Sequence, residues 1–184
     1  MTRIDLSNYQ NRLSRSNQIK RFLWSITWFI FATPLPRSLG NQWKIMLLRL
    51  FGAKISNSAV IYSSVKIYAP WNLEMKEYSC FAPEVDCYNV DKIVIGAHST
   101  ISQKSYLCSA SHDVTKGSNP LITAPIIIKD QVWIGAAVFI GMGVTIEQGA
   151  VIGATSSVYK DVEAWAIVGG NPAKFIKNRI LDND

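Results

Sequence analysis

IIIKDQVWIGAAVFIGMGVTIEQGAVIGATSSV, residues 126–158, carries an aliphatic side chain at every sixth position. This file consists of Ile128, Ile134, Ile140, Ile146, Ile152 and Val158, and a second file two residues earlier consists of Ile126, Val132, Val138, Val144, Ala150 and Ser156. A period of six matches neither a helix nor a plain strand, and it is typical of a solenoid. We expect each hexapeptide to form one short strand and one turn. Three hexapeptides then close a triangular coil, and each aliphatic side chain stacks on its copy about 4.8 Å away in the next coil.

The same period begins near Ile55 and predicts about five coils. Their inward positions are Ile55, Ile61 and Ile67; Met75, Phe81 and Cys87; Ile95, Ile101 and Leu107; Ile128, Ile134 and Ile140; and Ile146, Ile152 and Val158. Extra residues between the third and fourth coils indicate that residues 109–125 leave the solenoid as a loop, where binding surfaces often form. Glycine follows several inward positions, as at Gly135 and Gly153, and we expect it to give the backbone freedom that a tight corner needs.

The ends of a solenoid expose apolar side chains and therefore need caps. We expect residues 1–54 to form a polar arm, at residues 1–20, and a cap of two short helices, followed by the solenoid at residues 55–172. Residues 173–184 predict a short C-terminal helix and a tail over the other end. The apolar run at residues 22–33 is shorter than the roughly 20 residues that span a bilayer. It therefore predicts either a buried capping helix or a peripheral contact with a membrane.

Composition and charge narrow the kinds of function. The chain has 184 residues, of which 48% are hydrophobic and 17% charged, enough for one domain with a core. Its net charge of +6 favours anionic partners, but the basic residues form no long run and accompany no nucleic-acid motif, so we expect no nucleic-acid binding. The three cysteines match no metal spacing and indicate a reducing, cytoplasmic location. Only two histidines occur, His98 and His112, so we also expect no metal site.

Several segments resemble the hexapeptide-repeat acyltransferases. The matching segments are Ser111-His112-Asp113, Val132-Trp133-Ile134-Gly135, Gly143-Val144-Thr145-Ile146, Val151-Ile152-Gly153-Ala154, Lys160-Asp161-Val162 and Val168-Gly169-Gly170-Asn171-Pro172-Ala173. The match covers about residues 55–178, and the resemblance implies a left-handed parallel β-helix that uses acetyl-CoA. Residues 68–73 and 107–113 look most similar to the colanic-acid-type O-acetyltransferases of polysaccharide biosynthesis. The implied acceptor is therefore a sugar hydroxyl on a glycan.

His112 lies in the ejected loop and matches the catalytic histidine of that family. An imidazole, with a pKa of about 6.5, suits removal of a proton from an acceptor hydroxyl as its oxygen attacks a thioester. We therefore expect direct acetyl transfer with His112 as general base. The resemblance also implies that Asp86 and Asn89 hold the acceptor, and Asp86 could orient His112; the alternative is that both are polar corner residues. Another hydroxyl or amine acceptor, or a non-catalytic assembly protein with the same fold, remains possible from the sequence.

The resemblance further implies a coenzyme A groove between the subunits of a homotrimer. Trp133 points outward and would flank the pantetheine arm or pack on a neighbouring subunit. Ala136 and Ala154 match positions whose backbone atoms bind pantetheine. The candidates for the nucleotide phosphates are the basic residues near the C-terminus, Lys160, Lys174, Lys177 and Arg179. A solvated basic tail is the alternative for these four residues. Apolar side chains that we expect on an outer face, Val132, Trp133 and Phe139, would be a liability in a monomer.

Overall fold

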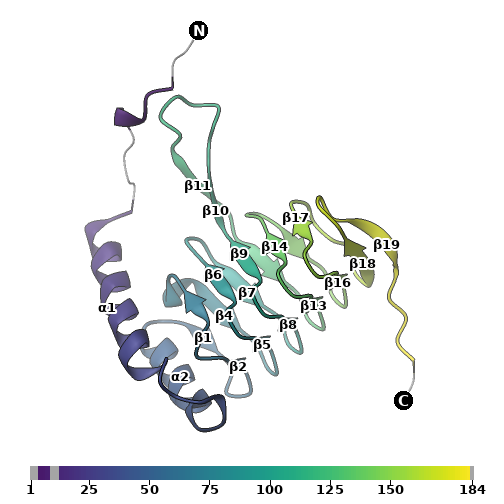
Figure 1. Cartoon of the computed structure of the whole chain (residues 1–184), viewed down its shortest axis with the longest axis horizontal. Helices are drawn as coiled ribbons and strands as arrows, with labels where there is room; N and C mark the ends of the chain where they lie inside the picture. The colour runs from purple at the N-terminus through teal and green to yellow at the C-terminus, as the bar shows by residue number, and fades with distance from the viewer. Residues whose placement is uncertain (1–3, 9–12, 183–184) are drawn as a thin grey trace.

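The computed structural model of the chain describes residues 4–8 and 13–182. Within them the chain winds into a β-solenoid of about six turns, with two helices at its N-terminal end (Figure 1). The strands of successive coils pair in parallel and form three sheets, which we call sheets A, B and C. Each complete coil contributes one strand to each sheet, so the predicted triangular coil is confirmed.

The strands are two to five residues long, because most residues of each hexapeptide form the corners. Sheet A contains β1 (Lys54–Ile55), β4 (Leu73–Met75), β7 (Ile93–Ile95), β12 (Ile126–Ile128) and β15 (Thr145–Ile146). Sheet B contains β2 (Val60–Ile61), β5 (Cys80–Phe81), β8 (Thr100–Ile101), β13 (Trp133–Ile134), β16 (Val151–Ile152), β18 (Ala166–Gly169) and β19 (Lys174–Asn178). Sheet C contains β3 (Lys66–Ile67), β6 (Asp86–Tyr88), β9 (Tyr106–Cys108), β14 (Phe139–Ile140) and β17 (Ser157–Val158).

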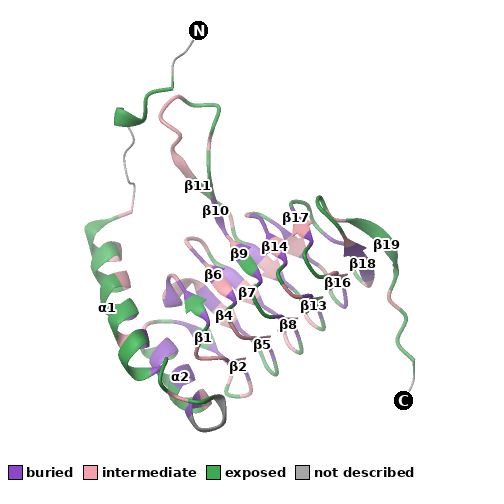
Figure 2. Ribbon diagram, in the orientation of Figure 1, coloured by how far each residue is buried: buried purple, intermediate pink, exposed green. Residues whose placement is uncertain are grey.

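The predicted inward side chains stack in register along the solenoid. In sheet A, Ile55 pairs with Met75, Met75 with Ile95, and Ile128 with both Ile95 and Ile146. None of these five side chains is more than 4% exposed. Figure 2 shows buried residues recurring along every turn of the solenoid. Both files of the six-residue period therefore face the core, which corrects the expectation that Val132 lies on an outer face, since it is only 1% exposed.

The solenoid extends one turn further than the five coils that the period predicts. Val162 bridges Ile146 in parallel, and β18 pairs with β16, so a sixth turn follows β17. The spacing from Val158 to Val162 is four rather than six, which hides this turn from a search for the period.

Glycine serves a different purpose from the one expected. The φ angle of Gly135 is not positive, whereas corner residues such as His98 and Gln131 have φ angles of 57° and 62°. A Cβ atom at Gly135 would lie 2.6 Å from the backbone nitrogen of Ala154 and 2.8 Å from the carbonyl oxygen of Ile152. Gly135 is thus required by the close approach of the next coil, not by the conformation of the corner.

Two helices cap the first coil, as predicted. They are α1 (Arg15–Phe31) and α2 (Arg37–Leu50), and a short 3-10 helix, η1 (Leu6–Asn8), precedes them. The Ser14 side chain accepts a hydrogen bond from the backbone N–H of Asn17 and caps α1. The helix therefore includes residues 15–20, which the sequence assigns to the polar arm. Residues 1–3 and 9–12 of that arm lie outside the described part of the chain.

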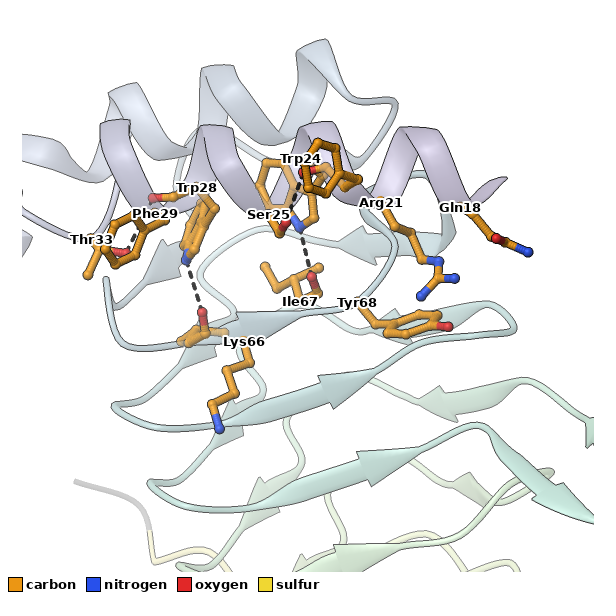
Figure 3. Close-up of a pocket in the computed structure, with 12 residues that line it drawn as sticks. Gln18, Arg21, Trp24, Ser25, Trp28, Phe29, Thr33, Lys66, Ile67 and Tyr68 are labelled. Carbon is orange, nitrogen blue, oxygen red and sulfur yellow. Dashed lines mark hydrogen bonds between the residues drawn. The ribbon is translucent and has the colours of Figure 1, made fainter. Parts of the chain in front are cut away.

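The helices also cover the open strand edges of the first coil. Figure 3 shows Trp24 and Trp28 pointing from α1 toward β3, where their indole N–H groups donate to the carbonyl oxygens of Ile67 (2.7 Å) and Val65 (3.1 Å). In α2, the Asn41 side-chain N–H donates to the Ala59 carbonyl, and its Oδ1 accepts from the Ile61 N–H of β2. Arg49 of the same helix donates to the Ile55 carbonyl of β1. Helix side chains thus satisfy backbone groups at the first strand of all three sheets.

The C-terminal end closes with a strand, so the predicted short C-terminal helix at residues 173–184 is wrong. β19 pairs antiparallel with β18, in a register that joins Ile167 to Lys177 and Gly169 to Lys174. The last strand of sheet B has an open edge, and only an extended segment can satisfy its N–H and carbonyl groups. This requirement outweighs the helical spacing of the segment. Residues 183 and 184 of the predicted tail are outside the described residues.

Candidate active site

The loop predicted at residues 109–125 is an antiparallel β-hairpin that projects away from the coils (Figure 1). Its strands are β10 (Ala110–His112) and β11 (Leu121–Thr123), and the backbone N–H of Ala124 donates to the Ser109 carbonyl at its base. The hairpin leaves the solenoid after β9 of sheet C and rejoins it at β12 of sheet A. It therefore stands on the edge between sheets C and A, which we call the C–A edge.

His112 is exposed at the end of β10, with its ring orientation defined by the turn of the hairpin. Its Nδ1 lies 2.7 Å from the carbonyl oxygen of Asn119. A carbonyl oxygen can only accept, so Nδ1 carries the proton and Nε2 keeps the lone pair that a general base needs. The backbone of Asn119 thus selects the tautomer that suits proton abstraction.

Asn119 contacts His112 and is a candidate site residue that the sequence analysis missed. It has φ of 42°, a conformation that asparagine tolerates, and it precedes Pro120. Within the described residues its side-chain oxygen is buried and has no hydrogen-bond partner. The asparagine–proline pair is a turn signal that could have located the tip of the hairpin, although not its contact with His112.

The two residues predicted to hold the acceptor have different environments. Asn89 is fully buried, and its amide donates to the Ala69 carbonyl (2.6 Å) while its Oδ1 accepts from the Ala69 N–H (2.9 Å). The amide of Asn89 thus joins two coils, and this placement does not support its predicted role as an acceptor-binding residue. Asp86 is partly exposed on the outer side of β6, in register with Lys66 and with Tyr106 of β9. Burial raises the pKa of the Asp86 carboxyl, and the charge of Lys66 opposes that effect.

Aromatic side chains line the outer surface of sheet C beside Asp86. They are Tyr68, Tyr88, Tyr106, Phe139 and Tyr159, with successive ring centroids 4.7, 6.4, 5.7 and 5.5 Å apart. Burial raises the pKa of Tyr106 well above its ordinary range. These rings occupy outward positions next to the inward file, so the alternation of a strand places them, but their continuity appears only after the coils are stacked.

The residues predicted to bind pantetheine lie elsewhere on the prism. Trp133 is 50% exposed on the outer side of sheet B, which confirms that it points outward. Ala136 and Ala154 follow β13 and β16 at the edge between sheets B and C, and the N–H of Thr155 donates to the Ala136 carbonyl at 2.8 Å. Lys177 lies in the same outward row of sheet B as Trp133, because the register connects Trp133, Val151, Ile167 and Lys177. We call the corner that carries Ala136 and Ala154, between sheets B and C, the B–C edge.

The four predicted phosphate-binding residues separate into groups. Lys160 and Lys174 line one hollow of about 510 Å³ at the C-terminal end of the solenoid. Arg179 instead donates to the carbonyl oxygens of Gln131 (3.0 Å) and Gly149 (3.1 Å). It fastens the C-terminal segment to the coils, so its predicted role as a phosphate contact is not supported.

Among the described residues no group of three or more His, Cys, Asp and Glu side chains could hold a metal ion. Burial raises the pKa of the Cys87 thiol far above its ordinary value, in line with its predicted place in the core. His98 stacks on Tyr78 with ring centroids 5.0 Å apart, and Asp113 binds Thr115 and Lys116.

The candidate residues are thus divided between two edges of the prism. His112 stands on the C–A edge, whereas Ala136 and Ala154 lie on the B–C edge, with sheet C between them. A site that uses residues of both edges must either extend across sheet C or combine two copies of the chain.

Comparisons with known proteins give a consistent picture. No family model matches the chain. The protein named "Putative colanic acid biosynthesis acetyltransferase WcaF" in Escherichia coli (strain K12) is 44% identical over 167 residues, which cover 89% of this chain and 90% of that protein. A chloramphenicol acetyltransferase of Klebsiella aerogenes is 53% identical over 58 residues, 32% of this chain and 28% of that protein.

Solved structures agree with these relatives. A hexapeptide-repeat acetyltransferase of Vibrio cholerae O1 biovar eltor, solved with acetyl coenzyme A, has a TM-score of 0.80 and 26% identity, covering 92% of both chains. A maltose O-acetyltransferase of Clostridium difficile 630 also has a TM-score of 0.80, with 25% identity over 91% of this chain and 90% of that chain. With a relative 44% identical along nine tenths of its length and with this fold, the chain belongs to the hexapeptide-repeat, left-handed β-helix acetyltransferases and is a homologue of WcaF.

Proposed function

We propose that the chain is an acetyl-CoA-dependent O-acetyltransferase that modifies a sugar hydroxyl in polysaccharide biosynthesis. The single observation that carries this proposal is the 2.7 Å contact between His112 Nδ1 and the Asn119 carbonyl, on a hairpin matched to the catalytic segment of the family. Two comparisons support the substrates: the name of WcaF refers to colanic acid, and the Vibrio cholerae structure holds acetyl coenzyme A.

In the proposed reaction, His112 acts as general base toward the acceptor. Nε2 takes the proton of the sugar hydroxyl as its oxygen attacks the thioester carbonyl, while the Asn119 carbonyl holds the Nδ1 proton and stabilises the imidazolium. The proton then passes to the departing thiolate of coenzyme A. Asp86 is the remaining candidate for binding another hydroxyl of the sugar. Direct transfer needs no covalent acyl-enzyme.

Coenzyme A fits the groups on the B–C edge. Trp133 offers an exposed ring, and the small side chains of Ala136 and Ala154 leave the surface beside it open. Lys177 adds positive charge in the row of Trp133, and Lys160 and Lys174 add more in the hollow at the C-terminal end of the solenoid. Since Ala136 and Ala154 lie on a different edge from His112, we infer that two copies of a homotrimer build each site. A cytoplasmic location belongs to the same proposal, because the three cysteines, all in the described part of the chain, form no disulfide.

The reaction is tested by coenzyme A release from acetyl-CoA with a panel of sugars and amino sugars. His112→Asn keeps an N–H donor for the Asn119 carbonyl and removes the base, so turnover should fall about 10²–10⁴-fold while coenzyme A binding persists. His98→Asn is the matched control, because asparagine tolerates the positive φ at position 98. Wild-type turnover by His112→Asn would reject the mechanism. Release with amines alone would favour an amine acceptor, and the absence of release with every acceptor tested would favour an assembly protein.

The trimer is tested by mass and by mixing. Sedimentation should give a particle of three 20.5 kDa chains. His112→Asn and Ala154→Trp should each be inactive alone, and activity should return when the two variants are mixed and reassembled, because some sites then combine an intact C–A edge with an intact B–C edge. No recovery in mixed trimers would mean that each chain carries a whole site.

A further inference from the structure

The charge of the chain is distributed unevenly along its length. Residues 6–73 contain nine of the nineteen basic residues and none of the thirteen acidic ones, whereas residues 74–184 contain nine basic and twelve acidic residues. The first segment comprises both helices and the first coil. All of the net positive charge therefore belongs to the N-terminal end of the solenoid, although the basic residues form no long run there.

Helix α1 is apolar on two opposite sides. Trp24, Trp28 and Ala32 are buried against the first coil. The outward side chains include seven large apolar residues with exposed fractions from 41% to 73%, namely Ile19, Phe22, Leu23, Ile26, Phe29, Ile30 and Phe31. Figure 2 shows this side of α1 exposed over most of its length. A helix that only capped the solenoid would have a polar outer side, so the capping role explains just one of the two faces.

The hydroxyl groups of α1 are satisfied within the helix. Ser25 Oγ donates to the Phe22 carbonyl at 2.8 Å, and Thr27 Oγ1 donates to the Leu23 carbonyl at 2.9 Å. Such internal bonds let a hydroxyl leave water without an unsatisfied donor. The outer side of α1 can therefore enter an apolar medium at low cost.

Beside this face, a groove of about 500 Å³ runs between α1 and the first coil. Phe22 and Phe29 line it together with Arg21 and Lys66, and the guanidinium of Arg21 lies 4.4 Å from the ring centroid of Tyr68 (Figure 3). Aromatic rings, aliphatic side chains and cations thus occur together at this end. The exposed Arg15 and Lys20 extend the positive charge along α1.

We propose that the outer face of α1 docks on the surface of an anionic lipid bilayer. The apolar side chains enter the boundary between headgroups and acyl chains, and the basic residues of the same end bind lipid phosphates. No helix of the described residues is long and apolar enough to cross a bilayer, so α1 lies in the interface. The solenoid is then held by its N-terminal end.

Charge favours a lipid surface over a second copy of the chain. Two copies that met through this face would bring two segments of nine basic and no acidic residues against each other. Like charges at an interface are unfavourable, whereas anionic headgroups complement them.

The proposal is tested by flotation of the full chain with vesicles of phosphatidylcholine alone, or of equal parts phosphatidylcholine and phosphatidylglycerol. The chain should bind the anionic vesicles and lose binding at high salt.

Three double variants separate the apolar and the charged parts of the face. Phe22→Gln combined with Phe29→Gln should weaken binding to the vesicles at least about tenfold. Ile180→Gln combined with Leu181→Gln, two exposed apolar residues of the C-terminal segment, should bind like the wild type. Arg15→Gln combined with Lys20→Gln should cost roughly fivefold per charge on anionic vesicles only.

Each outcome decides the proposal, and none depends on acetyl transfer. An unchanged melting temperature of the Phe22 and Phe29 variant shows that the cap remains folded. Failure of the wild type to bind anionic vesicles, or wild-type binding by that variant, would overturn the proposal. A change in sedimentation mass of the variant without a change in vesicle binding would assign the face to a second copy.

Discussion

The hairpin and the coils on either side of it are held together by different interactions. In the coils, residues such as Ile101 and Ile134 are completely buried and pair in register with their copies. In the hairpin, three paired residues and the His112–Asn119 contact hold an exposed strand pair on a base closed by Ser109 and Ala124. The coils therefore determine the shape of the molecule, whereas the hairpin carries the proposed general base outside the stacked core.

Excision of the hairpin should show the largest effect. Because Ser109 and Ala124 are already hydrogen bonded, residues 110–123 can be replaced by two glycines without reopening the coil. Acetyl transfer should fall by at least the 10²–10⁴-fold expected for loss of a general base, while the melting temperature should change by only about 2–4 °C. Coenzyme A release and thermal unfolding measure the two quantities. A collapse of the solenoid would show that the hairpin also supports the coils.

Phe81→Ala makes the opposite change, in a coil. Phe81 is fully buried in β5, and its removal should lower the free energy of unfolding by about 3–5 kcal/mol. At a temperature where the variant is folded, kcat/KM should remain near the wild-type value, because no reacting group has changed. Urea unfolding gives the stability, and exposed Phe175→Ala is the control, with an expected effect within about 0.5 kcal/mol. A large loss of kcat/KM in folded Phe81→Ala would mean that coil packing sets the site geometry.

The same contrast explains what could be predicted from the sequence. The inward file, the two capping helices and the position of the hairpin follow from periodicity and from its interruption, which are local properties of the chain. The strand at Lys174–Asn178 could not be predicted, because its conformation is decided by the open edge of β18. The contact of Asn89 with Ala69 could not be predicted for a similar reason, since Ala69 is twenty residues away and lies beside it only after the coils stack.

Asn89→Ala separates a structural from an acceptor role at this position. The substitution leaves the N–H and carbonyl of Ala69 without the two bonds that the amide supplies, at a cost of about 1–3 kcal/mol for a buried orphaned group. We expect lower stability in urea and an unchanged KM for the sugar. Exposed Asn57→Ala should leave both unchanged. A raised sugar KM with intact stability would return Asn89 to the acceptor site.

Asp86→Asn should give the smallest effect and tests whether the partly buried carboxylate of sheet C serves the hairpin or the coil. The pKa of Asp86 is raised in the folded state, so its ionisation opposes folding, and this loss of stability develops as the pH rises from about 3.8. Asp86→Asn should therefore raise the melting temperature at pH 7 and not near pH 3. Because the group is partly exposed, the gain should stay below about 1 kcal/mol, or roughly 4 °C. Lys66→Gln removes the charge that stabilises the carboxylate and should lower the melting temperature at pH 7.

The KM for the sugar decides what the carboxylate does. If Asp86→Asn is more stable and has a raised sugar KM, the carboxylate binds the acceptor at a cost in the stability of the coil. An unchanged KM would restrict Asp86 to a structural position and leave the hairpin to recognise the sugar.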